Sequence, residues 1–275
     1  MTRWAKRALG QNFLVDPNLQ RKIVAELGAT PRDVVLEVGP GHGELSGHLI
    51  GRVARLVLIE KDRELAAGLR ERWGDEAGIE VVEADALDID LATWHVPGRD
   101  LRILSNVPYN VTTPLLFSFL EIRPAPRRLV LTVQREVAER VVAGPGSRTY
   151  GALSVGVQAI ADARLAFGVG RLAFRPVPDV ESAVLVIEPD PARVARIDPD
   201  RLRDTSRALF GQRRKQIRKI LRTAPGIVRP DDPVGLLESL GIEPTARPET
   251  LSPERIVALS EALAPRSSMP PERPR

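Results

Sequence analysis

Four consecutive residues, Asn106, Val107, Pro108 and Tyr109, combine hydrogen-bond acceptors with an aromatic ring. The exocyclic amine of a nucleic-acid base is a poor nucleophile, and acceptors that hold its pyramidal form favour attack. Asn106 offers a side-chain carbonyl, and Pro108 restricts Val107 so that its backbone carbonyl is fixed. The Tyr109 ring offers a surface for an unstacked base. The tetrad predicts a catalytic site that methylates the exocyclic amine of a base, and adenine is the expected base. Taken alone, the same four residues also fit a simple turn.

An apolar run from Leu101 to Leu104 must place this tetrad, because it is typical of a buried strand. The residues after the tetrad, Thr113 to Leu120, are typical of a helix. We therefore expect Ser105 to Pro114 to form an exposed loop at the carboxyl end of a strand, where open α/β sheets bind their ligands.

A glycine cluster follows another buried-strand run, Val34 to Val38, in the order Gly39, Pro40, Gly41, His42, Gly43. Gly39 and Gly41 allow a sharp turn and a close approach to a ligand. A helix-like segment, residues 44–50, comes next, so the pattern predicts a strand, loop and helix that bind a nucleotide-type ligand. A dinucleotide fingerprint would place glycine at position 44, where this chain has Glu, and NAD is therefore disfavoured.

Acidic residues end the next two strand-like runs. Glu60 follows 56–59 and is placed to accept both hydroxyls of a ribose, and Asp85 follows 79–83 and can accept from an adenine amine. Any one of these would more often be a solvated carboxylate, and the same holds for Glu37. Their joint order, without a lysine in the glycine loop or a Walker pattern, predicts a ligand with a sulfonium and no phosphates, which is S-adenosylmethionine.

Over nearly its whole length the chain resembles the bacterial KsgA-type small-subunit (16S) rRNA adenine N6,N6-dimethyltransferases. The segments that carry the resemblance, besides the glycine loop and the tetrad with Thr113 and Pro114, are 9–14 (LGQNFL), 134–138 (QREVA), Tyr150 and Gly151, 174–183 (FRPVPDVESA), Phe210 with 213–215 (RRK), and 247–249 (RPE). The first segment, the tetrad and the distal basic motif are together highly specific.

The resemblance implies which residues form the site. The S-adenosylmethionine pocket would be lined by Asn12, Leu14, Gly39, Glu60, Asp85 and Asn106, joined by Gly41 of the glycine loop. Asn106 and Tyr109 would hold the target base, and Phe174 would stack on its other face. The implied product is N6,N6-dimethyladenine at two adjacent adenines near the 3′ end of 16S rRNA, made on the 30S subunit or its precursor during ribosome biogenesis.

Four positions depart from the family pattern: Val107 replaces the usual Leu, Asp179 stands where Lys is common, Glu181 replaces Asp, and His42 is often Leu. Val107 should be tolerated because its backbone carbonyl does the chemistry. Asp179 removes a positive charge close to where RNA would pass and puts local phosphate contacts in doubt.

Composition agrees with a cytoplasmic, monomeric enzyme. The 275 residues, 43% hydrophobic, allow one large and one small domain with real cores. The absence of Cys excludes disulfides and thiolate metal sites, and the three His lack ligand spacing, so we expect no metal. No apolar run approaches the length of a membrane span, and the first twenty residues lack a signal-type stretch.

Basic residues are concentrated near the C-terminus. Residues 201–223 carry nine Arg or Lys against one Asp, and the first ten residues carry three basic and no acidic side chains. We expect one amphipathic helix over about 200–222, with Arg214, Arg218 and Arg222 on a face opposite its apolar residues. Because like charges at this spacing repel, the face predicts a polyanion partner. RNA would contact Arg213, Arg214, Lys215 and Arg218.

The chain is predicted to be α/β, with a Rossmann-like S-adenosylmethionine-dependent methyltransferase sheet and a small C-terminal α-helical domain. Residues 1–188 would form the catalytic domain with a basic N-terminal arm, 189–199 a linker, 200–264 a helical RNA-binding domain with further helices near 232–240 and 252–263, and 265–275 a disordered tail.

Two other functions remain open. The related macrolide-resistance enzymes methylate adenine in large-subunit (23S) rRNA, and the segments 210–215 and 174–183 favour the small-subunit group over them. A noncatalytic ribosome-assembly factor would keep the fold and the RNA contacts. The intact Asn106 and Tyr109 argue against it.

Overall fold

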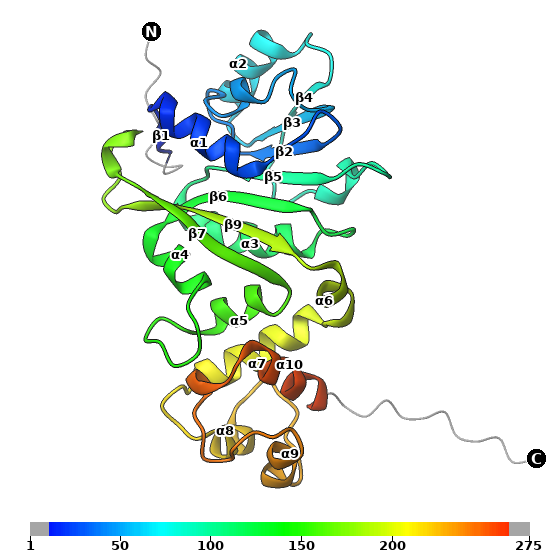
Figure 1. Cartoon of the computed structure of the whole chain (residues 1–275), viewed down its shortest axis with the longest axis vertical. Coiled ribbons are helices and arrows are strands. Elements are labelled where there is room, and N and C mark those ends of the chain that lie inside the picture. The colour runs from blue at the N-terminus through cyan, green and yellow to red at the C-terminus, as the bar shows by residue number, and fades with distance from the viewer. Residues whose placement is uncertain (1–10, 264–275) are drawn as a thin grey trace, which may run out of the picture. The chain divides into compact units, whose positions relative to one another are not determined.

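The computed structural model describes residues 11–263, coloured in Figure 1. The predicted basic arm before residue 11 and the predicted tail after 264 lie outside the described residues. The chain divides into two compact units. The first comprises Met1–Val142 and Ile160–Ala195, and the second comprises Ala143–Ala159 and Arg196–Arg275.

A seven-stranded sheet forms the centre of the first unit, in the order β4-β3-β2-β5-β6-β9-β7 (Figure 1). The strands are β2 (Val34–Val38), β3 (Arg55–Glu60), β4 (Ile79–Glu83), β5 (Leu101–Ser105), β6 (Arg128–Gln134), β7 (Ala161–Val169) and β9 (Ser182–Pro189). The first five are parallel, and β9 pairs antiparallel with both β6 and β7. The predicted α/β methyltransferase fold class is confirmed, with an antiparallel pair completing the sheet.

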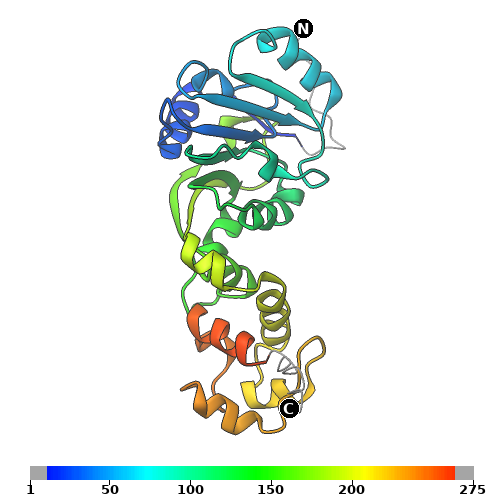
Figure 2. The same ribbon diagram turned by 90° about the vertical axis from the view of Figure 1, so that its right-hand side faces the viewer.

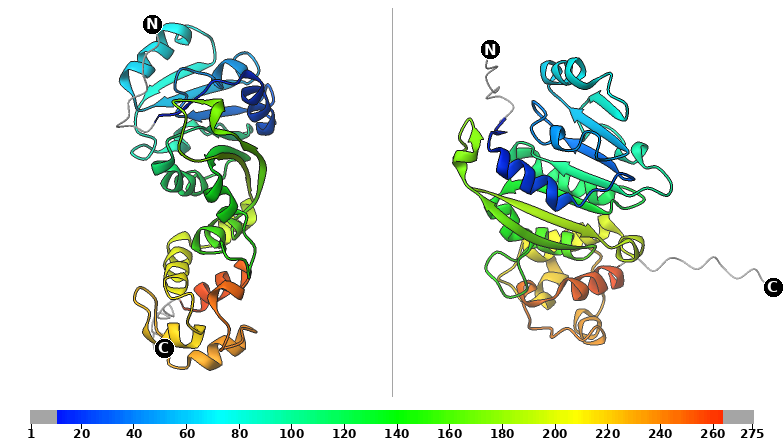
Figure 3. Two further views of the ribbon diagram at one scale, coloured as in Figure 1. Left: turned by 90° about the vertical axis from the view of Figure 1, so that its left-hand side faces the viewer. Right: turned by 45° about the horizontal axis from the view of Figure 1, so that its top comes forward.

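Helices cover both faces of this sheet. The helices of this unit are α1 (Pro17–Leu27), α2 (Arg63–Trp73), α3 (Thr112–Glu121), α4 (Arg135–Val141) and α6 (Pro191–Arg196), with short 3₁₀ turns at Ser46–His48, Leu91–Trp94, Tyr109–Val111 and Arg171–Ala173. In Figure 2 the dark blue α1 and the green α3 lie on opposite sides of the strands. The right-hand view of Figure 3 shows α1 lying across the strands.

Capping residues in the local sequence set both ends of helix α1. The Asp16 side chain accepts the backbone N–H groups of Asn18 and Leu19, and Pro17 occupies the first helical turn. Gly28 ends the helix in the left-handed region, at φ 57°. A second sheet consists of two short antiparallel strands, β1 (Phe13–Leu14), which precedes this helix in the chain, and β8 (Phe174–Arg175). It brings the N-terminal segment against the region before β9.

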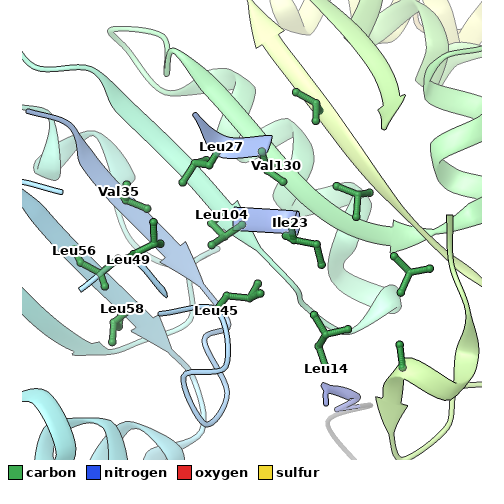
Figure 4. Packing of buried hydrophobic residues seen from close by; sticks show 14 of the residues in the cluster. Leu14, Ile23, Leu27, Val35, Leu45, Leu49, Leu56, Leu58, Leu104 and Val130 are labelled. Carbon is green, nitrogen blue, oxygen red and sulfur yellow. The ribbon is translucent and has the colours of Figure 1, made fainter. Parts of the chain in front are cut away.

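The core lies between α1, the turn after the glycine loop and the sheet (Figure 4). Ile23 and Leu27 of α1 are completely buried, and so is Val35 of β2. A buried ion pair joins the same elements, because Arg102 Nε lies 2.7 Å from Asp33 Oδ2 while Arg102 Nη1 donates to the Leu27 carbonyl. The ion pair lies at the amino ends of β2 and β5, whose carboxyl ends lead into the glycine loop and the tetrad.

The segment after the glycine loop differs from the prediction. Residues 44–50, expected to be helical, form turns and a single 3₁₀ turn at Ser46–His48. Three glycines at 43, 47 and 51 disfavour a regular helix. Gly43 also has φ 85°, and a Cβ there would lie 2.3 Å from the Trp73 ring.

The second unit contains helices and loops in its described residues, which appear yellow to red in Figure 2 apart from α5. Its helices are α5 (Ala152–Gln158), α7 (Pro199–Phe210), α8 (Ile217–Thr223), α9 (Pro233–Ser239) and α10 (Pro253–Ala262), with a 3₁₀ turn at Pro248–Thr250. The single helix expected over 200–222 is broken at Gly211, and the basic motif Arg213 to Lys215 lies in the turn. Arg214 therefore does not share a helix with Arg218 and Arg222.

Loop 244–246 and Gly211 explain this break. Glycine weakens the helix at 211, and the first N–H groups of α8 bond outside the helix: Ile217 N donates to the Ala246 carbonyl and Arg218 N to the Pro244 carbonyl. These long-range contacts favour a new helix start at 217.

The two units are not consecutive stretches of the chain. Residues 143–159 group with the C-terminal helices, and Tyr150, which is completely buried, donates its hydroxyl to the Leu251 carbonyl at 2.9 Å. The segment expected as a linker contains α6, because Asp190 accepts the N–H groups of Ala192 and Arg193 and Pro191 begins the helix.

Candidate active site

A cavity of about 290 Å³ opens at the carboxyl ends of β2, β3, β4 and β5. Its walls come from three places: the N-terminal segment, the strand ends with their following loops, and the loop after β5. The lining residues are Gln11, Asn12, Phe13, Val38, Gly39, Pro40, Gly41, Glu44, Ile59, Glu60, Lys61, Asp62, Leu65, Ala84, Asp85, Ala86, Asn106, Val107, Pro108, Asn110, Val111 and Leu115. Parallel strands thus bring Gly39, Glu60, Asp85 and Asn106 to one edge, where open α/β sheets bind ligands.

The glycine loop needs its glycines at this edge. Gly39 has φ 71° and Gly41 has φ 63°, both in the left-handed region. A Cβ at Gly39 would lie 2.8 Å from the Val107 side chain, and one at Gly41 would lie 3.0 Å from the Phe13 ring. The loop therefore approaches both the tetrad and the N-terminal segment as closely as backbone allows.

Glu60 holds the floor of the cavity together. Its Oε2 accepts the Gly41 N–H at 3.1 Å, and its Oε1 accepts the Asp62 N–H at 2.8 Å. Burial raises the pKa of Glu60, whose exposure is only 6%. Each carboxylate oxygen has two lone pairs, so acceptor capacity remains for a ligand hydroxyl. Asp62 accepts the Glu64 N–H at the start of α2 and lies 3.4 Å from Gln11 Nε2.

Asp85 has a partner that the sequence analysis did not foresee. Its Oδ2 lies 2.6 Å from Lys61 Nζ, and its Oδ1 accepts the Leu87 N–H. The hydrogen bond from Lys61 is the main reason that the pKa of Asp85 is lowered. The carboxylate is therefore charged and held in place, and the expected contact with an adenine amine would use an oxygen that already accepts one hydrogen bond.

Two further carboxyl groups lie near the glycine loop. Glu37, 1% exposed, accepts the Ser46 hydroxyl at 2.7 Å, and burial raises its pKa to about 8. It does not line the cavity. Glu44 does, and its Oε2 accepts the His42 N–H at 3.2 Å; burial raises the pKa of Glu44 to about 6.

The tetrad forms the opposite wall. Asn106, Val107 and Pro108 line the cavity, whereas Tyr109 does not. The Tyr109 hydroxyl instead lies 2.6 Å from the Ser182 Oγ of β9, and burial raises the pKa of Tyr109. Ser105 Oγ donates to the Val38 carbonyl at 2.9 Å, which ties the strand before the tetrad to the strand before the glycine loop.

Two predicted site residues lie elsewhere. Leu14 and Phe174 are each 1% exposed, pair across the β1–β8 ladder and belong to the hydrophobic core. The expected stacking of Phe174 on a base does not fit this arrangement, because a ring enclosed by core side chains offers no free face. Leu14 is absent from the cavity wall, and its carbonyl accepts Gln20 Nε2 at 2.8 Å. The large apolar side chains were the available signal for core positions.

Several cavity residues were not predicted from the sequence. Gln11 and Phe13 belong to the segment that carried the resemblance, and Lys61 and Asp62 directly follow Glu60. Glu44 was noted only as a departure from the dinucleotide fingerprint, and Asn110 directly follows the tetrad. A search for polar residues within two positions of each predicted ligand contact would have found Lys61, Asp62 and Asn110.

The basic residues of the second unit have different surroundings. Arg213 lies 2.9 Å from Glu249 and also donates to the Arg148 carbonyl. Lys215 Nζ lies 2.7 Å from Gln212 Oε1, and Arg218 Nε lies 3.1 Å from Gln216 Oε1. Arg214 and Lys215 are exposed, and Arg213 and Arg218 are half-buried. Arg213 thus has a structural ion pair, whereas within residues 11–263 no carboxylate forms an ion pair with Arg214, Lys215 or Arg218.

Within residues 11–263 no cluster of three metal-ligating side chains is found. Helices in that same range are all too short or too polar to cross a membrane.

The cavity fits S-adenosylmethionine by its donor and acceptor groups. Glu60, which remains able to accept, is suited to a ribose, and the backbone at Gly39 and Gly41 permits the approach of a ligand. Among the described residues, Lys61 is the only basic side chain in the wall, and it is paired with Asp85, so this part of the chain offers no unpaired cation for a phosphate. The surplus of carboxylates favours a cationic ligand.

Comparison with known proteins agrees with this geometry. The "Ribosomal RNA small subunit methyltransferase A" of Nitratidesulfovibrio vulgaris strain Hildenborough is 42% identical over 263 residues, covering 94% of this chain and 97% of that protein. The protein of the same name from Phenylobacterium zucineum is 41% identical over 97% of this chain and 91% of its own length.

Two solved structures share the fold. A dimethyladenosine transferase from Plasmodium falciparum superposes with a TM-score of 0.78 at 24% identity, over 90% of this chain and 95% of its own. The 23S rRNA methyltransferase ErmE superposes with a TM-score of 0.66 at 26% identity, over 91% of this chain and 99% of its own. The family model described as "Ribosomal RNA adenine dimethylase" matches residues 3–263, and the chain belongs to this family of S-adenosylmethionine-dependent methyltransferases.

Proposed function

We propose that this enzyme transfers methyl groups from S-adenosylmethionine to the N6 amines of two adjacent adenines near the 3′ end of 16S rRNA, on the 30S subunit or its precursor. The observation that carries the proposal is the placement of the tetrad against the glycine loop, with Val107 where a Gly39 side chain would be. The small-subunit assignment is supported by relatives of that name at 41–42% identity, against 26% for the 23S enzyme.

S-adenosylmethionine supplies an electrophilic methyl group when it is bound. Asn106 and the Val107 carbonyl accept the amine hydrogens of the adenine and hold its lone pair toward the cavity. Tyr109, whose hydroxyl bonds to Ser182, holds its ring as a stacking surface for the flipped base. The proton lost by the amine passes to water after transfer, and no general base is required.

The RNA contacts are assigned to the second unit. Arg214, Lys215 and Arg218 would contact phosphates, and Arg213 would support the turn that presents them. Such contacts carry affinity without reading sequence, so the choice of adenine is left to the tetrad and the fold of the RNA. An enzyme of this function works in the cytoplasm as part of ribosome biogenesis and is expected to act as a monomer, since residues from a single chain line the cavity.

The deciding experiment uses 30S and 50S subunits from a strain that lacks the 16S modification. Incubation with the enzyme and S-adenosylmethionine should give N6,N6-dimethyladenine at two neighbouring positions of 16S rRNA and none in 50S. Methylation of 50S subunits instead would favour the 23S alternative. Tight binding to 30S with no methyl transfer, at a concentration that saturates the cavity with cofactor, would favour a noncatalytic assembly factor.

A further inference from the structure

The cavity carries more negative charge than a ribose site requires. Within the described part of the chain, five charged side chains line it: Glu44, Glu60, Lys61, Asp62 and Asp85. Lys61 and Asp85 form an ion pair at 2.6 Å and largely cancel. Three carboxyl groups remain, and residues 11–263 contribute no arginine to the wall.

Two of these three carboxyl groups, those of Glu60 and Asp62, accept backbone hydrogen bonds that stabilise the fold. Glu60 accepts backbone N–H groups at Gly41 and Asp62, and Asp62 accepts the first free N–H of α2 at Glu64. Glu44 has a smaller structural part, because its Oε2 accepts one loop N–H, from His42. That oxygen also lies 3.3 Å from the position of a Cβ at Gly41, so the carboxylate sits beside the loop that a ligand approaches.

We propose that Glu44 is a specificity-determining residue that makes the cavity bind S-adenosylmethionine in preference to the reaction product, S-adenosylhomocysteine. The proposal goes beyond the proposed RNA target and rests only on the cofactor. The two ligands share adenine, ribose, amino and carboxylate groups. They differ by one methyl group and one positive charge, so a carboxylate that acts through charge changes the ratio of their affinities, whereas a hydrogen-bonding contact to the shared groups changes both alike.

A charge in a half-buried wall is effective over several ångströms, since the effective dielectric near a protein surface is far below that of water. Loss of the Glu44 charge should therefore lower the affinity for S-adenosylmethionine by about tenfold and that for the product by less than about twofold. In the cell, this preference would reduce occupancy of the cavity by product between the successive transfers that dimethylation needs.

The pH dependence of ligand affinity provides a second, independent test of the proposal. Burial raises the pKa of Glu44 to about 6, so the group is charged at pH 7.5 and largely neutral at pH 5. The charge of Glu60 also raises the pKa of Glu44, and Arg72 of α2 lowers it. Glu44 in turn raises the pKa of the buried Glu37. A bound cation favours the charged form. The affinity for S-adenosylmethionine should therefore fall as the pH falls through about 6, while the affinity for the product changes little.

The test is calorimetric titration of the full chain, without RNA, with each ligand between pH 5 and 7.5. The variant is Glu44→Gln, whose amide oxygen can still accept the His42 N–H. The matched control is Glu71→Gln, an exposed position on α2 with the same change in net charge. We expect the preference for S-adenosylmethionine to fall about tenfold in Glu44→Gln at pH 7.5, to remain in Glu71→Gln, and to depend less on pH in Glu44→Gln than in the other two proteins.

His42 neighbours Glu44 and is present in all three proteins, so the comparison between them changes only the carboxyl group. An equal loss of affinity for both ligands in Glu44→Gln, or no loss of affinity for either ligand, would overturn the proposal. Should that variant fail to fold, the wild-type profile still decides, because a preference that stays flat from pH 5 to 7.5 is incompatible with it. None of these outcomes depends on which RNA is methylated, so they are distinguishable from failure of the proposed function.

Discussion

The hydroxyl of Tyr109 and the Oγ of Ser182 lie 2.6 Å apart, although 73 positions separate the two residues in the chain. Ser182 is fully buried at the start of β9, so it is a fixed anchor. The bond ties the tetrad to the strand that pairs with both β6 and β7. It explains how a ring on a short 3₁₀ turn is held without lining the cofactor cavity.

This bond separates two contributions of Tyr109. Tyr109→Phe keeps the ring and loses the hydrogen bond, and should weaken productive RNA binding by roughly 0.5 to 1.5 kcal/mol. Tyr109→Ala also loses stacking and should cost a further 1 to 3 kcal/mol, roughly. Binding of 30S subunits and single-turnover rates measure both. Ser182→Ala is the matched control, since it removes the same bond from the other side; a much larger effect than that of Tyr109→Phe would indicate disruption of β9 instead.

Asn106→Ala should lower the rate of methyl transfer far more than it lowers RNA affinity. The side-chain carbonyl matters most as the amine rehybridises, and removal of one preorganised polar group costs roughly 2.7 to 4 kcal/mol in the transition state. Single-turnover assays at saturating RNA and cofactor isolate this step. Asn110→Ala, which also changes an amide in the cavity wall, is the comparison. A near-normal rate for Asn106→Ala would exclude the proposed mechanism.

Glu60→Ala should weaken S-adenosylmethionine binding by roughly 2 to 3 kcal/mol, because charge-assisted hydrogen bonds to the ribose are lost. The structure adds a second cause, since the Gly41 and Asp62 N–H groups lose their acceptor. Glu83→Ala, at the end of the neighbouring strand β4 and outside the cavity wall, is the control. Calorimetric titration of folded proteins is the measurement, and unchanged affinity would remove Glu60 from the site.

The basic residues of the second unit should divide into two groups. Replacement of Arg214, Lys215 and Arg218 with Gln should reduce the slope of log affinity against log salt by about two, at roughly 0.7 to 0.9 for each lost phosphate contact. Cofactor affinity should stay the same.

Arg213→Gln is the matched structural variant, because Arg213 pairs with Glu249 at 2.9 Å. It should lower the melting temperature with a smaller effect on the slope. Binding to 30S particles over a salt series, with melting curves of the same proteins, tests both. A parent-like slope for the triple variant together with a lowered melting temperature would make all four residues structural.

Glu37 should make stability depend on pH. Its folded-state pKa, about 8, lies above the ordinary value of 4.5, so its contribution is fully present below 4.5 and is lost as the pH rises through 8. Glu37→Gln removes this dependence. Between pH 5 and 8 the free energy of unfolding of the wild type should therefore decrease, relative to that of the variant, by roughly 3 to 4 kcal/mol.

Denaturant unfolding at several pH values measures this difference, and its trend matters more than its value at any one pH. Ser46→Ala is a useful companion, because it removes the hydrogen bond at 2.7 Å but keeps the carboxyl group. An identical pH dependence in wild type and Glu37→Gln would show that Glu37 does not titrate in this range.

Local patterns predicted the parts of the site that are contiguous in the chain. The buried run 34–38, the glycine loop and the acidic strand ends could be read because parallel strands place consecutive carboxyl ends at one edge. The pairing of Lys61 with Asp85 spans 24 positions and leaves no local signal. The apolar side chain of Phe174 is typical of a core position, but the ladder that pairs it with Leu14 depends on residues far apart in the chain. The break at Gly211 depends on loop 244–246 in the same way.

Residues 143–159 belong to the second unit although they lie between the two stretches of the first, and this determines how the protein can be divided into fragments. Truncation after residue 195 removes the later helices but leaves α5 behind, and with it Tyr150 and Val155, both fully buried in the intact chain. Such a fragment would expose this apolar surface and become prone to aggregate. Isolation of the first unit therefore requires two edits: truncation at the C-terminus, and replacement of 143–159 by a short polar turn that joins α4 to β7.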